Sequence, residues 1–168
     1  MCCEGREVAH AARLQPRRPH PRLSPAAVSL HLHWLTLRYG VEVHLQFADL
    51  RSRYGDQKAD RIRLSRYIAS DEQALDTLRH EYAHAVAELK HGRKDGHGRL
   101  WRRLAVEMGA RPRSCGRGPL LAVPLLQPSC AACGHAHAPR ARRSPRARCR
   151  ACRSRRIEWH PVVATRFG

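Results

Sequence analysis

The sequence predicts an α+β protein with a short C-terminal unit organised by cysteines. Three observations indicate this class. Apolar residues follow helical spacing in some segments and strand spacing in others, one segment carries two histidines four residues apart, and two pairs of cysteines lie near the C-terminus. The length of 168 residues suits one domain with a small appendage. We predict a disordered basic arm at 1–23, a core at 24–128 and a cysteine unit with an arginine-rich tail at 129–168.

The N-terminal arm is rich in arginine and proline, so it offers too few apolar side chains to pack. It contains no apolar stretch of the kind found in signal peptides, and none is expected. Cys2 and Cys3 have no accompanying pattern, so we expect them neither to bind metal nor to carry a lipid.

The core begins with a predicted helix. The dipeptide Ser24–Pro25 supplies an N-cap followed by proline at the first helical position. The helix is expected to run to about Tyr39 and to stop at Gly40. We interpret His31 and His33, which lie on it, as surface or packing residues and not as metal ligands.

Two segments after this helix predict strands. Residues 41–47 and residues 61–65 both alternate apolar with polar side chains, which is typical of half-buried strands. Tyr54, Gly55 and Asp56 between them indicate a turn. We therefore expect a small antiparallel sheet.

A second helix follows the strands. Ser70 and Gln73 have the spacing of a capping box, and Gly92 is a suitable C-terminal stop. One face of the helix is apolar, which predicts that it packs on the core. That face comprises Leu75, Leu78, Tyr82, Ala85, Val86 and Leu89.

The opposite face of this helix carries the motif His80-Glu81-x-x-His84. Residues i and i+4 lie about 40° apart around a helix and about 6 Å apart along it, so both imidazoles can reach one zinc ion. Glu81 points to the neighbouring side, where it can act as general base toward a metal-bound water. A helix, a strand pair and then this helix is the order expected of a zincin-like metalloprotease core.

A catalytic zinc site needs a third protein ligand and an open position. His91 shares the azimuth of the pair but lies roughly 10 Å further along a continuous helix. Glu107 is the candidate if the site is of the gluzincin type. The metzincin pattern is absent, because Ala87 and Lys90 stand where it requires glycine and histidine.

His97 is the remaining candidate for the third ligand. Gly96 and Gly98 flank it and allow a sharp backbone turn, and a helix is expected over residues 99–108. The chain can therefore fold back and present His97 to the first two histidines. After that helix, residues 111–129 contain four prolines and predict a connector, whose apolar part at 120–126 lies extended against the core.

Two C-x-x-C pairs near the C-terminus have the spacing of a structural zinc site. Four thiolates close a tetrahedral site with no open position and can fold a segment that is too small for its own core. Gly134 fits the tight bend after the first pair, and we expect His135 and His137 not to be ligands. The four predicted ligands of this zinc ribbon are Cys130, Cys133, Cys149 and Cys152.

The chain is strongly basic, with a net charge of +18 and an isoelectric point near 11.1. Such charge favours nucleic acid as a partner over an anionic membrane surface, although a bias toward arginine codons would also produce it. Few acids accompany the arginines of the ribbon, so we expect them to contact DNA phosphates without reading sequence. These residues are Arg142, Arg143, Arg146, Arg148, Arg150, Arg153, Arg155 and Arg156.

The cysteine count and the hydropathy indicate a location. Seven cysteines are an odd number, and the spacing of four fits metal better than disulfides, which favours a reducing compartment. No apolar run approaches 18 residues, so no membrane span is expected. We predict a cytoplasmic monomer, associated with the nucleoid, or nuclear if the source is a eukaryote.

The run Leu78-Arg79-His80-Glu81-Tyr82-Ala83-His84-Ala85, followed by Asp95-Gly96-His97-Gly98 and Trp101, resembles the SprT-like family of zinc metalloproteases, which includes the DNA-repair protease Spartan. The resemblance spans roughly residues 35–159. It implies His80, His84 and His97 as zinc ligands and Glu81 as catalytic base. It also agrees with a C-terminal zinc ribbon.

Three functional hypotheses follow. The first is a zinc endopeptidase acting on proteins bound or crosslinked to DNA, with one catalytic and one structural Zn2+. The second is a non-catalytic nucleic-acid-binding module whose first site is closed by Glu107 or His91. The third is a broad cytosolic peptidase without any link to DNA. The group that stabilises the oxyanion stays open among Tyr54, Tyr67 and the arginines.

Overall fold

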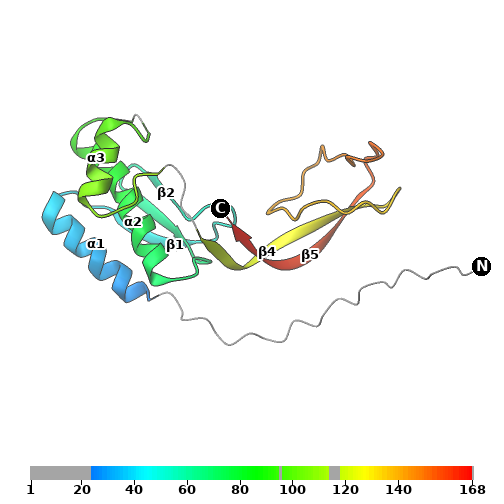
Figure 1. The fold of residues 1–168 in the computed structure, drawn as a ribbon, viewed down its shortest axis with the longest axis horizontal. Helices are drawn as coiled ribbons and strands as arrows, with labels where there is room; N and C mark the ends of the chain where they lie inside the picture. Colours follow the sequence, from blue (N-terminus) through cyan, green and yellow to red (C-terminus); the bar gives the residue numbers. More distant parts are fainter. Residues whose placement is uncertain (1–23, 95, 114–117, 168) are drawn as a thin grey trace, which may run out of the picture.

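The computed structural model describes residues 24–94, 96–113 and 118–167, so the arm expected at 1–23 lies outside the described residues. Its elements confirm the α+β class: three α-helices and two small sheets. In Figure 1 the helices and the first sheet gather at one end, and a two-stranded arm extends away from them. The elements are α1 (Pro25–Tyr39), β1 (His44–Ala48), β2 (Gly55–Lys58), β3 (Arg61–Ser65), α2 (Asp71–Ala85), the π-helix η1 (Val86–Lys90), α3 (Arg99–Glu107), β4 (Pro119–Cys130) and β5 (Ile157–Phe167).

Helix α1 begins and ends where the sequence predicts. The Ser24 hydroxyl accepts a hydrogen bond from the Ala27 N–H at 3.3 Å, and Pro25 opens the helix. At the other end, Gly40 adopts a left-handed conformation and donates its N–H to the Thr36 carbonyl at 2.8 Å.

Neither histidine of α1 belongs to a cluster of potential metal ligands among the described residues. His33 is exposed, and His31 accepts a hydrogen bond from Arg79 Nε at 2.9 Å. Their interpretation as surface or packing residues agrees with these positions.

The first sheet is mixed, and the expectation of an antiparallel sheet is wrong in this respect. Its order is β1-β3-β2, with β1 parallel to β3 and β2 antiparallel to β3. The chain reverses direction twice between β1 and β3, which makes these two strands parallel. The predicted turn at residues 54–56 is also wrong, because Gly55 and Asp56 begin β2. Short and polar, β2 shows no alternation that periodicity could detect.

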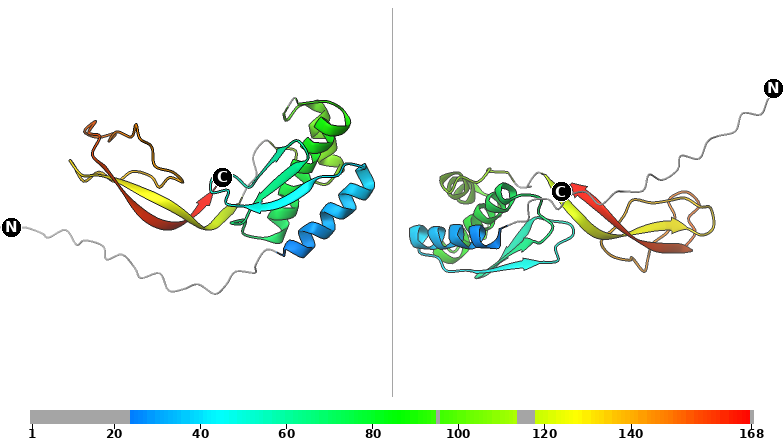
Figure 2. Two further views of the ribbon diagram at one scale, coloured as in Figure 1. Left: turned by 180° about the vertical axis from the view of Figure 1, so that it is seen from behind. Right: turned by 90° about the horizontal axis from the view of Figure 1, so that it is seen from below.

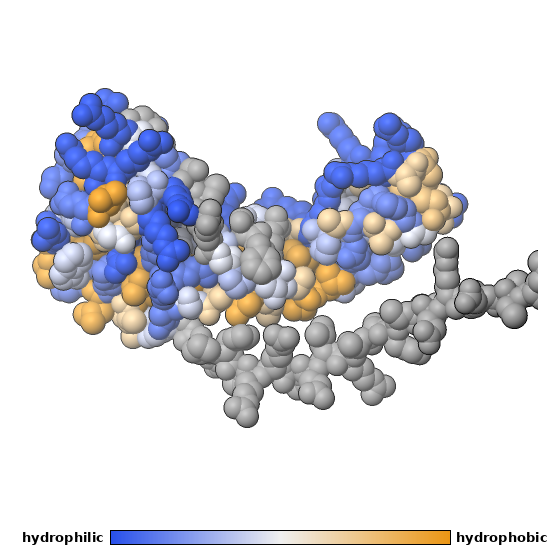
Figure 3. All heavy atoms as spheres, in the orientation of Figure 1, coloured by the Kyte–Doolittle hydropathy of each residue, from blue (hydrophilic) through white to orange (hydrophobic). Residues whose placement is uncertain are grey.

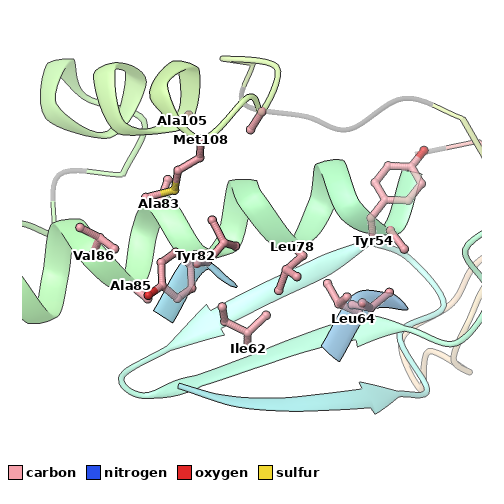
Figure 4. Close-up of a cluster of buried hydrophobic side chains, with 14 of the residues drawn as sticks. Tyr54, Ile62, Leu64, Leu78, Tyr82, Ala83, Ala85, Val86, Ala105 and Met108 are labelled. Atoms are coloured by element: carbon pink, nitrogen blue, oxygen red, sulfur yellow. The ribbon is translucent and has the colours of Figure 1, made fainter. Parts of the chain in front are cut away.

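The core lies between α2 and the sheet. Leu78 and Tyr82 are fully buried, as are Ile62 and Leu64 of β3, and the four lie together in Figure 4. The predicted apolar face of α2 holds for most of its residues. Leu89 is 44% exposed, because the change to a π-helix at η1 rotates the following residues relative to an α-helix.

The capping of α2 follows the predicted box with one shift. The Ser70 hydroxyl accepts from the Gln73 N–H at 3.2 Å, while Gln73 Oε1 accepts from the N–H of Ala69, one residue before the cap. The helical segment closes after η1, where Gly92 is left-handed as expected of a stop.

Strands β4 and β5 form a long antiparallel ribbon that periodicity does not reveal. Most of the expected connector belongs to β4, whose residues Leu120, Val123 and Leu125 are buried against the core as predicted for this apolar stretch. Prolines are tolerated in β4 because a two-stranded ribbon has two edges. The strand runs through residues 128 and 129, where we place the boundary of the cysteine unit.

Candidate metal centres

Three imidazoles converge at one end of the core. His80 and His84 project from the same face of α2, and His97 lies in the loop before α3. His97 Nε2 is 3.1 Å from His80 Nε2 and 3.3 Å from His84 Nε2. Nitrogens bound to one tetrahedral zinc ion lie about 3.3 Å from one another, given Zn–N distances of about 2.0–2.1 Å. The three nitrogens therefore have the spacing of a zinc site.

The loop before α3 brings His97 back over α2. Gly96 is left-handed, a conformation that favours glycine, and Gly98 is the extended N-cap of α3. The two other candidates for a third ligand, His91 and Glu107, are exposed and do not join the histidine group among the described residues.

Trp101 packs against all three rings of the histidine group. Its fully buried ring lies 4.7 Å from His80, 5.1 Å from His84 and 4.4 Å from His97, measured between ring centroids. The indole Nε1–H donates to the His80 carbonyl at 3.3 Å. One side chain thus restrains all three imidazoles. The sequence indicates Trp101 only as part of a motif and does not reveal this packing role. The signal that could have revealed it is that Trp101 lies four residues after His97, in the first turn of the predicted helix.

The imidazoles are neutral near pH 7. Burial, with a contribution from His97, lowers the pKa of His80 to about 4. Burial together with the other two histidines lowers the pKa of His84 to about 4. Burial and then Arg102 lower the pKa of His97 as well. A neutral imidazole has a free nitrogen lone pair, which metal binding requires.

Glu81 lies beside this group and is buried, with 9% of its surface exposed. Burial, reinforced by Asp56 and opposed by Arg53, raises the pKa of its carboxyl group to about 7. A carboxylic acid with this pKa can both accept and donate a proton near neutral pH.

Strand β2 approaches Glu81 closely because residue 55 is a glycine. A Cβ atom at Gly55 would lie 2.8 Å from Cγ2 of Thr77 and 3.1 Å from Cγ of Glu81. Because β2 is an outer strand of its sheet and packs against α2, its free edge lies next to the motif helix. Sequence reasoning takes Gly55 for a turn residue and therefore misses this close approach.

The tyrosines considered for oxyanion stabilisation donate hydrogen bonds elsewhere. Tyr54 donates its hydroxyl to the Gly118 carbonyl at 2.5 Å, and Tyr67 donates to Asp49 Oδ1 at 2.5 Å. The first bond reaches the residue before β4, and the second reaches the loop after β1. In these contacts neither hydroxyl donates to the histidine group.

The second centre lies at the end of the β4–β5 arm, and all four of its cysteines are free thiols. Cys130 and Cys152 Sγ atoms are 3.6 Å apart, as are those of Cys133 and Cys149. A disulfide bond is about 2.05 Å long, whereas thiolates on one tetrahedral zinc lie about 3.8 Å apart. The observed spacing fits four ligands of one ion.

The two C-x-x-C segments have the same backbone geometry. Gly134 and Arg153, each following the second cysteine of its pair, are both left-handed. Their N–H groups donate to the carbonyls of Cys130 at 2.8 Å and Cys149 at 3.0 Å. Burial opposes ionisation of Cys130, but N–H groups of Ala132 and Cys133 and the neighbouring thiols lower its pKa to about 6.

His135 and His137 stay outside the cysteine group, as expected. Their rings pack on each other with centroids 4.7 Å apart. Nε2 of His137 is buried without a hydrogen-bond partner among the described residues.

The arginines predicted to contact DNA lie on the segment that joins β4 to β5. This segment includes the outer end of the arm in Figure 2, and it returns to the core at Ala141, the neighbour of Arg142. All eight are exposed, and none forms an ion pair with a described acid. In Figure 3 hydrophilic side chains cover much of this end, while a hydrophobic strip follows the middle of the arm.

The model of the SprT-like family matches residues 27–117, which is more than half of the chain, so the protein belongs to this family. The match includes all three histidines and Glu81 and ends before the cysteine unit. No curated protein and no solved structure matches the chain. Among the described residues, no helix combines the length and the apolar character needed to cross a membrane.

Proposed function

We propose that the protein is a zinc-dependent endopeptidase with its active site at His80, His84, His97 and Glu81. The observation that carries this proposal is the convergence of three neutral imidazoles beside a buried carboxyl group. The donor set fits zinc, because three nitrogen ligands with an open fourth position are typical of catalytic zinc sites. Bound there, zinc would supply a Lewis acid that lowers the pKa of a water and polarises the scissile carbonyl.

Glu81 performs the proton transfers in this proposal. Its pKa of about 7 allows the carboxylate to take a proton from the attacking water and then to give it to the leaving amine. His80, His84 and His97 hold the ion, while Trp101 fixes their rings. The group that stabilises the developing oxyanion stays unassigned.

The free edge of β2 is the proposed binding surface for the substrate peptide. An extended chain can add to an exposed sheet edge through main-chain hydrogen bonds, which gives affinity with little sequence selectivity. Because Gly55 brings β2 against α2, a peptide on this edge would lie next to Glu81.

We further propose that the arm serves DNA binding and that the natural substrates are proteins bound or crosslinked to DNA. A structural zinc at the four cysteines would fold the segment that carries the arginines. Exposed arginines without acidic partners favour phosphate contacts that do not depend on sequence. The free thiols favour a reducing compartment, in accord with a cytoplasmic or nuclear location.

Substitution of Glu81 by glutamine tests the peptidase. The variant should retain zinc but lose cleavage of a DNA-bound protein by about 10²–10⁴-fold, because the amide cannot accept the proton. Elemental analysis and a cleavage assay measure the two properties. Glu107→Gln, which changes an exposed glutamate on α3, is the matched control and should cleave normally. Full activity in Glu81→Gln contradicts the assigned base.

A hydroxamate separates the peptidase from the non-catalytic module. Such a chelator needs an open coordination position, so it should bind the histidine site of a peptidase but not a site closed by a fourth protein ligand. Dependence of cleavage on DNA then separates the proposed role from that of a broad peptidase, since salt should weaken a phosphate-driven effect.

A further inference from the structure

A hollow of about 530 Å³ lies where the core meets the arm. One side is the loop after β1, which contributes Arg51 and Arg53, and the other is the segment at residues 141–142. Its volume falls within the range of about 300–1,000 Å³ that is usual for ligand sites. Its described lining consists of arginines, aspartates, small residues and Leu50, with no aromatic side chain among them.

Described contacts hold the two sides of this hollow together. Arg51 Nη1 donates to the Pro124 carbonyl of β4 at 3.2 Å. Arg140 and Leu126 exchange two backbone hydrogen bonds of 2.7 and 2.8 Å, and Ala141 packs against the core. The hollow is therefore a built feature of the fold.

The charges around the hollow do not cancel. Asp49 is engaged by Arg51 at 2.8 Å and by the Tyr67 hydroxyl. Asp56 is engaged by Arg63 through two hydrogen bonds of 2.7 Å each. Each acid thus already has an arginine partner.

Two guanidinium groups remain to act on a ligand. Arg53 is 61% exposed, and its ion pair among the described residues is a 3.4 Å contact with Asp56, which Arg63 already binds. Arg142, on the opposite side, is exposed and has no ion pair with a described acid. The hollow therefore presents positive charge from both of its sides.

We propose that this hollow binds phosphate groups of a nucleic-acid strand, held between Arg53 of the core and Arg142 of the arm. Arg142 is also the first of the eight arginines predicted to contact DNA, so a strand bound along them would extend into the hollow. The absence of aromatic lining means that the site holds backbone phosphates and does not stack bases. The site extends the proposed association with DNA and does not depend on peptidase activity.

The location of the hollow indicates a role for the proposed phosphate site. Arg53 and Asp56 line it, and between them in sequence lies Gly55 of the edge strand β2, where an added Cβ atom would lie 3.1 Å from Cγ of Glu81. A strand held in the hollow would therefore keep any protein attached to it close to the proposed peptide-binding edge.

The salt dependence of DNA binding tests the site. Wild type, Arg53→Gln, Arg142→Gln and the double variant are compared in filter binding to a labelled oligothymidylate over a series of salt concentrations. Each lost phosphate contact should reduce the slope of log K against log salt by about 0.7, and the double variant by about 1.4. Arg53→Lys retains the charge and should retain the slope.

Arg103→Gln is the matched control, because Arg103 is an exposed arginine of α3 that does not line the hollow, and its slope should equal that of wild type. Slopes of Arg53→Gln and Arg142→Gln that equal the control overturn the proposal. If Arg150→Gln then still lowers the slope, DNA binds the arm alone and the proposed association with DNA stands. If wild type itself shows no salt-dependent binding, that association fails together with the site, while the peptidase assay is unaffected.

Discussion

At the scale of single residues, the candidate active site depends on groups that surround the motif. Trp101 supports three imidazoles, and Gly55 lets a strand pass against Glu81. Neither residue carries reactive chemistry, so a search for ligands and bases overlooks both. Their roles follow from packing distances, which a sequence does not contain.

Gly55→Ala should impair the protein through overpacking. The new methyl group would lie 2.8 Å from Thr77 Cγ2 and push β2 away from α2, at a cost of about 1–3 kcal/mol in stability and with a loss of cleavage. Thermal denaturation and peptide cleavage measure these effects. Adding Thr77→Ser removes that Cγ2 and keeps the hydroxyl bonded to Gln73, so the double variant should recover part of both. No recovery would argue against this contact as the cause.

Glu81 should also give the zinc-free protein a distinct pH dependence. Its folded pKa of about 7 exceeds the usual value near 4.5, so its contribution to stability is complete below pH 4.5 and is lost as pH rises through 7. Glu81→Gln removes this loss. In chelator, denaturant unfolding should show the variant more stable than wild type by about 3 kcal/mol at pH 8 and close to it at pH 4.5. A constant difference across this range contradicts the buried acid.

At the scale of elements, η1 links two parts of the candidate active site. Glu88 on this π-helix accepts from Gln57 of β2 at 3.2 Å and pairs with Lys94, in the loop before His97, at 2.8 Å. π-Helical turns are often found at functional sites. One carboxylate thus connects β2, the proposed peptide-binding strand, with the loop that carries the third histidine.

Loss of this connection should loosen the zinc site. In Glu88→Gln the ion pair disappears, and a partly exposed pair is worth about 0.2–1 kcal/mol, so zinc affinity at the histidine site should fall by up to about fivefold. Competition with a metal chelator measures it. The exchange of Glu88→Lys with Lys94→Glu should restore part of the affinity, and Lys58→Gln, at an exposed position of β2, should leave it unchanged.

The left-handed residues that follow the two C-x-x-C segments of the arm allow a second test at this scale. Arg153 adopts a left-handed conformation that Gly134 adopts without strain, and for other residues this costs roughly 1–2 kcal/mol. Arg153→Gly should therefore raise the thermal stability of the arm by about 0.5–1 kcal/mol after the entropy of glycine is deducted. Gly134→Ala should lower it by about 1 kcal/mol. Opposite signs contradict the shared geometry.

The elements also show what the sequence could and could not predict. Helix α1, the start of α2 and the helix after Gly98 follow from caps and apolar spacing, which are local signals. Strand β2 is polar and four residues long, and β5 contains a proline, so each exists through pairing with a partner strand. Pairing between distant segments produces no recognisable pattern in the local sequence. The metal-type clusters were predictable because ligand spacing is itself a local pattern.

At the scale of the whole molecule, the two candidate metal centres are formed by different elements. The histidine group belongs to α2 and the loop before α3, and the cysteines lie at the far end of the β4–β5 arm (Figure 1). The core does not use residues 131–156 for its sheet or helices. We therefore expect that either centre can be removed without loss of the other.

Cys149→Ser tests this separation. The variant should bind one zinc per chain instead of two and lose affinity for DNA, because the arginine segment loses its anchor. It should still cleave a peptide that is not attached to DNA. Ala151→Ser, which adds a hydroxyl in the same knuckle without removing a ligand, should behave as wild type. Loss of peptide cleavage in Cys149→Ser would show that the arm supports the core.

The indole beneath the imidazoles has one more consequence. Trp101 is fully buried and touches every ring of the group, whereas Trp34 is 47% exposed and Trp159 is also partly accessible to solvent. The emission of Trp101 should therefore occur at shorter wavelength than that of the other two. Its intensity should change when an ion enters the site, so the protein carries its own optical reporter of occupancy.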